Sequence, residues 1–311
     1  MKKVVVLLNM GGVDELAHVR VFLKNMFNDP YILGIKNRYL RAFVAWMITT
    51  MRVKSATQNY LQLGGKSALG DITRLLISKL NAKFGSDNLI FDYAMNYTPP
   101  FAFDTFKKYK DADEIVLFPL YPHHSTTTIL SSLKSAQKAL SDLKIEAKVS
   151  IIEYFYNNIK FNNIIYNHII KTLGDDDASG IDLIFSAHSL PQKIIDNGDL
   201  YEKHLREHVG ILSSLLNSRG VRFKSITLAY QSRLGPIKWL EPNLSEVLPN
   251  LTSKRVMIYP ISFCIDNSET DFELAIEYKH IADENKFEYY KVVKAPNDSD
   301  EFAQFIAKSV I

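Results

Sequence analysis

Cysteine is almost absent from this chain, which contains a single one, Cys264, among 311 residues. One thiol excludes an intramolecular disulfide, a zinc site built on cysteines and a Cys-ligated iron–sulfur cluster formed within the chain. A chain without disulfides fits a reducing compartment, so we expect a cytoplasmic protein.

Long apolar runs and an excess of one charge are also missing. No stretch reaches the ~18 apolar residues that a membrane-spanning helix needs. The 37 basic and 34 acidic residues give a net charge of +3, and the basic ones are scattered, so no nucleic-acid partner is expected. Hydrophobic residues make up 47% of the chain, which is enough for a sizeable core.

The common nucleotide-binding motifs are incomplete. An apolar run ends at Gly11-Gly12, but the third glycine of a dinucleotide fingerprint is missing. A second pair, Gly64-Gly65, precedes Lys66, yet Tyr60 stands where a phosphate loop has its first glycine. These glycines still allow tight turns and a close approach of the backbone to a ligand.

Strand-like apolar runs alternate with helical patterns along the whole chain. The expected strands cover residues 4–8, 89–95, 114–120, 148–154, 181–185, 224–230, 255–261 and 287–293. Such alternation predicts an α/β fold with parallel sheets and right-handed crossovers. No repeat is visible in the letters, but each half holds roughly four strands. We therefore expect two doubly wound domains, residues 1–155 and 156–311.

The run from Ile181 to Phe185 leads into Ser186-Ala187-His188 and ends before Pro191. His188 is therefore expected near the carboxyl end of a central strand, at the edge where open α/β sheets bind ligands. Its imidazole can transfer protons or bind a metal near neutral pH. On this stretch alone, the alternative is a histidine hydrogen-bonded into a loop.

An acidic row follows another strand end. Glu269, Glu273 and Glu277 recur every four residues, so they share one helix face, and Asp266 precedes them. One histidine with several carboxylates is a ligand set suited to a divalent metal such as Fe²⁺, and the same groups can accept protons. A solvated acidic helix start, which complements the helix dipole, is the alternative.

Two other loops carry ring and hydroxyl side chains. His123 and His124 are adjacent and point apart in an extended loop, so a shared metal is not expected. Ser125 can cap the helix that follows. Trp239 can stack on a planar ligand, although a single tryptophan is more often part of a core.

Residues 38–53 are apolar nearly all round, with arginine or lysine at both ends. One interpretation is a buried helix. The alternatives are an apolar lip beside a greasy ligand and a shallow membrane contact, because Trp, Phe, Met and flanking Arg suit an interfacial helix.

Six stretches, in their order along the chain, resemble the ferrochelatase family, whose members insert Fe²⁺ into protoporphyrin IX in the last step of haem biosynthesis. They are Leu7 to Gly12, Tyr60 with Gly64 to Ser67, Pro119 to Pro122, Phe185 to Pro191, Gln231 to Pro242, and Asp266 to Glu277. The resemblance implies a class II chelatase fold, with two Rossmann-like domains and a porphyrin cleft between them.

By position, the resemblance makes His188 the active-site histidine and Glu269 the catalytic carboxylate. It adds Asp266 and Glu273 to these two as metal ligands.

The resemblance also indicates porphyrin contacts. It places Met10 and Tyr97 near the macrocycle, and we expect Ser125 and Trp239 there as well. Residues 31–53 match the apolar lip that covers the cleft and, in some members, touches the membrane.

The chain departs from the family at Asn96, where an arginine is usual, and at Asn267, where many members have histidine. No Cys-bearing extension follows, so we expect no iron–sulfur cluster and no cofactor beyond the substrate Fe²⁺. We expect a monomer in the cytoplasm that can contact the inner face of the cell membrane. The alternative functions are a chelatase for another tetrapyrrole and metal, and a two-lobed binding protein without chemistry.

Overall fold

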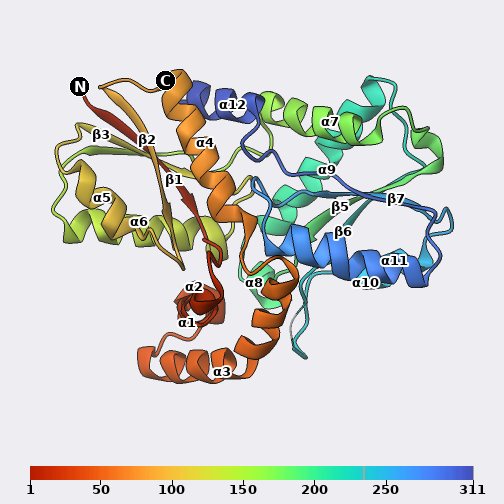
Figure 1. The fold of residues 1–311 in the computed structure, drawn as a ribbon, viewed down its shortest axis with the longest axis horizontal. Coiled ribbons are helices and arrows are strands. Elements are labelled where there is room, and N and C mark those ends of the chain that lie inside the picture. Colours follow the sequence, from red (N-terminus) through yellow and green to blue (C-terminus); the bar gives the residue numbers. More distant parts are fainter. Residues whose placement is uncertain (234, 311) are drawn as a thin grey trace. The chain divides into compact units, whose positions relative to one another are not determined.

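Two four-stranded parallel sheets form the framework of the computed structural model, which describes residues 1–233 and 235–310. Two residues lie outside the described ones. Leu234 belongs to the stretch Gln231 to Pro242, which resembles the ferrochelatase family, and Ile311 is the last residue of the second expected domain. Each sheet has helices on both faces (Figure 1), so the predicted doubly wound α/β fold is confirmed. The chain divides into two compact units.

The first unit is built on the strand order β2-β1-β3-β4. Its strands are β1 Lys3–Asn9, β2 Leu89–Met95, β3 Glu114–Pro119 and β4 Lys148–Ile151. Its helices are α1 Val19–Phe27, α2 Pro30–Leu33, α3 Arg38–Gln62, α4 Ala68–Phe84, α5 Ala102–Phe106, a π-helix Thr126–Leu130, α6 Ser131–Asp142 and α12 Asp300–Val310. Short 3₁₀ turns cover Leu16–His18 and Lys107–Tyr109.

Alternation along β1 and β3 explains why helices cover both faces of this sheet. Val4 and Leu117 point into a core cluster with residues of α5 and α6, among them Phe106 and Leu133. Phe118 points the other way and meets Phe305 of α12 edge-on, with ring centroids 6.5 Å apart. Because successive side chains of a strand face opposite sides, an uninterrupted apolar run needs a cover on each side.

The second unit repeats this arrangement with the order β6-β5-β7-β8. Its strands are β5 Asp182–His188, β6 Ser225–Gln231, β7 Arg255–Pro260 and β8 Tyr289–Val292. Its helices are α7 Ile159–Leu173, α8 Gln192–Asp196, α9 Tyr201–Ser218, α10 Leu244–Asn250, a π-helix Glu269–Glu277 and α11 Tyr278–Glu284, with a 3₁₀ turn at Ala178–Gly180.

The two units are structural repeats that the amino-acid letters do not reveal. In the first, the N–H of Leu120 donates to the oxygen of Leu8 at 2.8 Å, and in the second Ile261 donates to Ser186 at 2.9 Å. Each third strand ends in a proline and is followed by a loop and a π-helix. Single-turn π-helical segments are rare and frequent at functional sites, so both loops are of interest.

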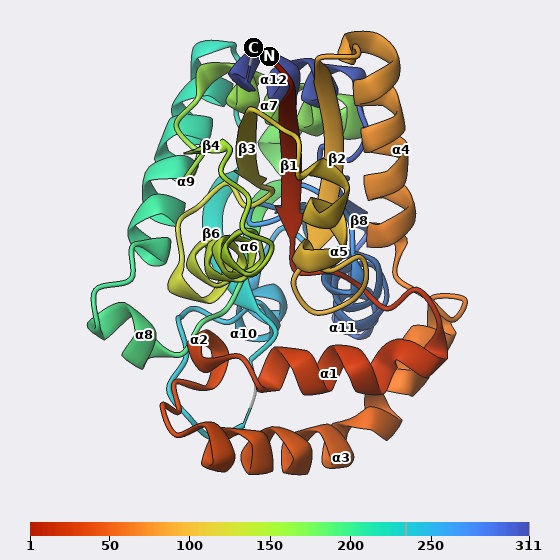
Figure 2. The ribbon, with the colours of Figure 1, turned by 90° about the vertical axis from the view of Figure 1, so that its left-hand side faces the viewer.

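Helix α3 is exposed, and the interpretation of residues 38–53 as a buried helix is wrong. The helix packs on α1, and the two lie beyond the carboxyl end of β1 (Figure 2). That contact buries little more than Ala45, Thr49 and Tyr60. On the other side Phe43 is 59% exposed and Trp46 58% exposed. A helix that rests on one neighbour can bury only one face.

The two units divide between Tyr154 and Phe155, one residue from the expected boundary, but two further segments are assigned across it. Unit 1 comprises Met1–Tyr121, Ser125–Tyr154 and Asp298–Ile311, and unit 2 comprises Pro122–His124 and Phe155–Asn297. The C-terminal segment belongs to the first unit because α12 packs beside α4 (Figure 1) and its Phe305 meets Phe118 of the sheet.

The α12 contact gives a stability prediction. Replacing Phe305 with alanine should lower the free energy of unfolding by about 3–5 kcal/mol, because a buried aromatic side chain is lost from a packed core. Chemical denaturation monitored by circular dichroism measures this change. Gln304→Ala, at an exposed position of the same helix, is the control and should change it by less than about 0.5 kcal/mol. Equal effects of the two variants would contradict the packing described.

Candidate active site

The carboxyl ends of β5, β6 and β7 bring the predicted catalytic side chains together in the second unit. β5 lies between β6 and β7, and the connections leave it in opposite directions, so its end is a topological switch point. His188 ends β5, Gln231 ends β6 opposite it, and β7 leads into the loop before Glu269. Ligands bind at such switch points in open α/β sheets.

The backbone of His188 is held on both sides. Its N–H donates to the Ser262 hydroxyl at 3.1 Å, and its carbonyl oxygen accepts from the Tyr201 hydroxyl at 3.0 Å. Burial lowers the pKa of the imidazole below its usual value, and the negative charge of Glu269 partly opposes that shift. Because the pKa is lowered, the imidazole is uncharged at neutral pH, and one of its ring nitrogens has a lone pair that can accept a proton.

Glu269, Glu273 and Glu277 lie along a π-helix rather than the α-helix that the spacing suggests. The three carboxyl groups still lie close to one another. This is seen at Glu273, whose pKa is raised by the charges of both Glu269 and Glu277. Exposure increases along the row, since Glu277 is exposed while Glu269 and Glu273 are partly buried. The row therefore runs from solvent toward the charge partner of His188.

Glu273 is the most perturbed member of the row. Burial, followed by the charge of Glu269, raises its pKa to about 8. Its Oε2 accepts from the Ser232 hydroxyl at 2.5 Å and from Nε2 of Gln231 at 3.2 Å. Ser232 reaches this position with φ +67°, a left-handed conformation that costs a non-glycine residue about 1–2 kcal/mol. Such local strain is typical of functional sites.

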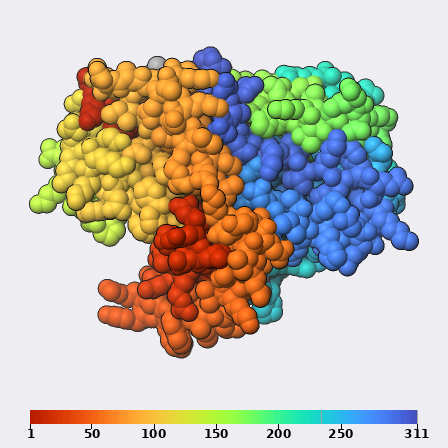
Figure 3. Space-filling model, in the orientation of Figure 1, coloured from red at the N-terminus to blue at the C-terminus, as the bar shows by residue number. Residues whose placement is uncertain are grey.

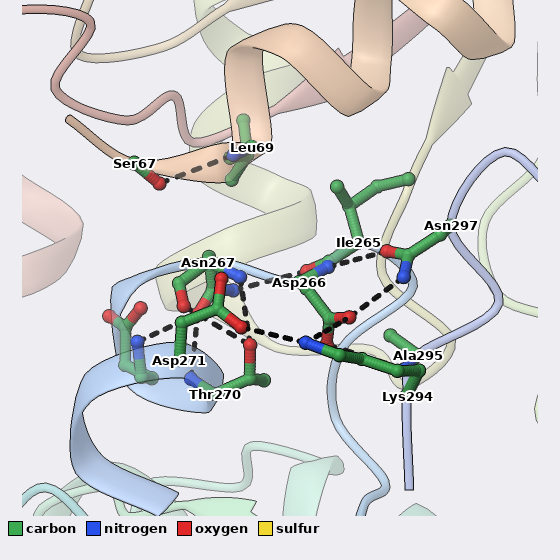
Figure 4. A network of polar contacts seen from close by, with 11 residues as sticks. Ser67, Leu69, Ile265, Asp266, Asn267, Thr270, Asp271, Lys294, Ala295 and Asn297 are labelled. Carbon is green, nitrogen blue, oxygen red and sulfur yellow. Dashed lines mark hydrogen bonds and ion pairs between the residues drawn. The ribbon is translucent and has the colours of Figure 1, made fainter. Parts of the chain in front are cut away.

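Asp266, predicted as a metal ligand, belongs to a different network, which Figure 4 shows. Its carboxylate accepts from Asn297 Nδ2 at 2.7 Å and from the main-chain N–H of Ala295 at 3.3 Å, and it lies 3.5 Å from Lys294 Nζ. Lys294 also pairs with Asp271 at 3.0 Å. Within residues 1–233 and 235–310, no three His, Cys, Asp or Glu side chains are grouped closely enough to hold a metal ion. The four predicted ligands thus do not form one ligand set, and Asp266 instead anchors the loop before the π-helix.

Asn267 has a capping role where many family members carry histidine. Its Oδ1 accepts from the N–H groups of Glu269 at 2.8 Å and Thr270 at 3.3 Å. These groups have no partner inside the helix, so a buried amide at this position stabilises the helix start.

Three of the predicted porphyrin contacts lie in the first unit. Met10 follows β1, and its carbonyl oxygen accepts from the N–H of Tyr97 at 2.9 Å. Tyr97 is buried, and its hydroxyl donates to Asp29 at 2.8 Å. Ser125 is also buried, and its hydroxyl accepts from the N–H of Thr127 at 3.2 Å, the predicted capping bond. The hydroxyls of Tyr97 and Ser125 are thus engaged within the unit, whereas Met10 is partly exposed.

Trp239, His123 and His124 lie in the second unit. Trp239 is partly buried and its backbone forms an isolated bridge with Pro191, near His188 in sequence. His123 and His124 face different partners: the imidazole of His123 meets His208 at 2.9 Å, and the N–H of His124 donates to His204 at 3.2 Å. The adjacent histidines therefore do not converge on one point.

Sequence reasoning missed Gln231, Ser232 and Tyr201 as members of the site. The first two were recognised only as part of a family stretch. Two polar residues that directly follow an apolar strand were the available signal, because polar side chains at a strand end meet the ligand edge of the sheet. Tyr201 gave no signal, since a tyrosine that begins a helix is ordinary.

Solved structures share the fold of this chain. SirB from Bacillus subtilis with Fe³⁺ matches with a TM-score of 0.57 at 11% identity and covers 100% of this chain and 94% of that chain. CbiX, the terminal enzyme for the biosynthesis of siroheme in denitrifying bacteria, matches with a TM-score of 0.52 at 10% identity and covers 100% and 98%. At these identities the likeness concerns the fold alone, which is that of the class II chelatases.

The chain belongs to the ferrochelatase family. A family model described as Ferrochelatase matches residues 2–311. The ferrochelatase of Campylobacter fetus is 66% identical over 310 residues, covering 100% of this chain and 99% of that protein, and the one from Campylobacter concisus is 58% identical over 306 residues, covering 98% and 96%. The protein is therefore a metal chelatase of haem biosynthesis that inserts iron into porphyrin, as the sequence predicts.

The raised pKa of Glu273 predicts a pH-dependent stability. The unfolded carboxyl ionises near pH 4.5 and the folded one near 8, so in between only the native state keeps the proton. The free energy of unfolding must then fall as pH rises through this window. Glu273→Gln removes that fall, and its stability relative to the wild type should increase from pH 5 to pH 8 by on the order of a few kcal/mol. Urea denaturation at the two pH values measures this, and parallel pH dependences would contradict it.

Proposed function

We propose that His188 and Glu269 perform the chemistry of iron insertion into protoporphyrin IX in this chain. Metalation requires the loss of the pyrrole N–H protons and the entry of a cation into a rigid planar ring. The observation that carries the proposal is the placement of a neutral imidazole next to a carboxylate row at the switch point of one sheet.

His188 is proposed as the acceptor of the pyrrole protons. A neutral imidazole has a lone pair for this task, and the adjacent Glu269 charge stabilises the imidazolium that forms. Ser262 and Tyr201 hold the histidine backbone, which limits the motion of the ring. A fixed base loses little freedom when the substrate binds.

The acidic row is proposed as the path for the substrate cation. Fe²⁺ accepts nitrogen and oxygen ligands, and the row supplies oxygen atoms from the exposed Glu277 to Glu269 beside His188. Glu273 keeps its proton at neutral pH, so the row holds less negative charge than three carboxylates would. A moderate charge suits a cation that must be released to the porphyrin. Asp266 is not one of these groups, because its carboxylate accepts from Asn297 and pairs with Lys294.

Met10 and Trp239 are proposed as contacts of the porphyrin ring. Both are partly exposed at strand ends or in loops, and a thioether and an indole suit a planar apolar ligand. For Tyr97 and Ser125 we propose an indirect role, since their hydroxyls hold neighbouring segments in place.

The two ends of the row should differ in their effect on turnover. Glu269→Gln should lower kcat by about 100-fold or more, because the charge beside His188 is lost. Glu277→Gln, the matched control two turns along, should lower it less than about tenfold. The rate is measured anaerobically with protoporphyrin IX and Fe²⁺ by visible absorption. Equal losses would show that the row acts as a unit and would refute the separate role of Glu269.

We further propose a cytoplasmic monomer that needs no resident cofactor and docks on a membrane through α3. Cys264 is buried, which suits a reducing compartment, and no helix among the described residues is long and apolar enough to cross a bilayer. Helix α3 lies at the surface in the view of Figure 3. Its Tyr39, Phe43 and Trp46 follow one another at helical spacing and are all exposed. The exposed Arg38 stacks on the Tyr39 ring and adds positive charge. Aromatic rings with flanking cations favour an anionic lipid surface.

Removing the aromatic side chains of α3 should weaken that docking. The double variant Phe43→Ala, Trp46→Ala should bind vesicles containing anionic phosphatidylglycerol at least about tenfold less tightly, since each ring that enters the lipid contributes about 1.5–3 kcal/mol. Leu75→Ala on α4, 57% exposed in the wild type, is the control. Co-sedimentation with the vesicles measures the affinity, and identical binding by all three proteins would contradict the proposal.

A further inference from the structure

Gln231 joins three elements of the second unit through a side chain that is 0% exposed. Its Oε1 accepts from the Ser186 hydroxyl on β5 at 2.5 Å. Its Nε2 donates to the main-chain oxygen of Glu269 at 3.0 Å and to Oε2 of Glu273 at 3.2 Å, both on the π-helix. The hydrogen-bonding capacity of this amide is therefore used to connect strand and helix.

The orientation of this amide follows from its partners. A carbonyl oxygen such as that of Glu269 can only accept a hydrogen bond, so the amide nitrogen must face the helix. The opposite orientation would place Oε1 against the main-chain oxygen of Glu269, which cannot donate. Ser186 then meets Oε1 and donates to it. Since the group is buried, no water can replace a lost partner without a cost.

Gln231 is also the direct neighbour of His188 in the sheet. The two residues are paired in the parallel register of β5 and β6, and the carbonyl oxygen of Gln231 accepts from the N–H of Ser189 at 2.8 Å. Strand pairing thus fixes Gln231 relative to the histidine, and its amide fixes the π-helix relative to Gln231.

We propose that Gln231 is a positioning residue that sets the distance between the His188 imidazole and the Glu269 carboxylate. This inference rests on the roles proposed above for those two residues. Reacting groups that are displaced by about 1 Å can lose about a hundredfold in rate, so a buried connection of this kind controls turnover without touching the substrate.

The first unit contains a comparable contact with a different chemical partner. Asn96, which follows β2, donates from Nδ2 to the Ser131 hydroxyl at the start of α6 at 2.7 Å. The repeated fold therefore places an amide at this position in both units. If the Gln231 amide had only a structural role, its loss would lower the stability of the protein and leave kcat unchanged. Only in the second unit does the amide contact a carboxylate row.

The decisive variant is Gln231→Met, which keeps the length of the side chain and removes its hydrogen bonds. We expect kcat to fall by about ten- to a hundredfold while KM for protoporphyrin IX stays within about twofold, because the binding contacts lie elsewhere. Asn162→Leu is the matched control, since Asn162 is an equally buried amide bonded to Tyr156 and His208. It should lower the melting temperature and leave kcat unchanged.

Ser186→Ala keeps the inference testable if Gln231→Met does not fold. Losing the bond to Oε1 should lower kcat a few-fold, and adding it to Gln231→Met should cause no further loss, because both act through the same amide. A wild-type kcat in folded Gln231→Met or in Ser186→Ala would overturn the inference, as would a loss no larger than that of Asn162→Leu.

Glu269→Gln, measured in the same series, separates the catalytic role proposed for Glu269 from the positioning role proposed for Gln231. If it retains wild-type kcat, the proposed catalytic role fails. If it is inactive while Gln231→Met turns over normally, only the positioning role of Gln231 fails.

Discussion

The pairing of β5 with its two neighbours is the constraint on which the site depends. His188 is opposite Gln231 on β6, and Ser186 is opposite Pro260 on β7. A slip of one residue in either register would turn the histidine to the other face of the sheet. Side-chain hydrogen bonds near both ends of β5 oppose such a slip, because Asp182 accepts from the Ser225 hydroxyl and Ser186 donates to Gln231.

The repeated architecture clarifies how chemistry is distributed along the chain. Aligning the two bonds after the third strands, Leu120 to Leu8 and Ile261 to Ser186, makes Met10 the counterpart of His188. The capping bonds from Thr127 to Ser125 and from Glu269 to Asn267 align the π-helices in the same way. The first unit thus carries a thioether and hydroxyls where the second carries an imidazole and carboxylates.

Much of the fold could be predicted because a buried parallel strand requires a continuous apolar run, and these runs are visible in the sequence. The place of His188 at the end of a central strand could be predicted as well, because the apolar run before it is visible, whereas Glu269 was singled out by the family resemblance. The role of Gln231 could not, because it depends on which strand lies beside β5. The partners of Asp266 could not either, since Lys294 and Asn297 come from a distant segment. The exposure of α3 depends on tertiary packing, and so does the assignment of α12 to the first unit. Local sequence patterns do not encode either.

We propose that His188 accepts the porphyrin protons while the rest of the second unit holds it in place. Visible absorption of the wild type and His188→Ala, each mixed anaerobically with protoporphyrin IX and Fe²⁺, tests it most directly. We expect the wild type to convert the free-base bands into haem bands, and the variant to bind the porphyrin with an unchanged affinity and leave its spectrum free-base. Normal haem formation by His188→Ala would contradict it.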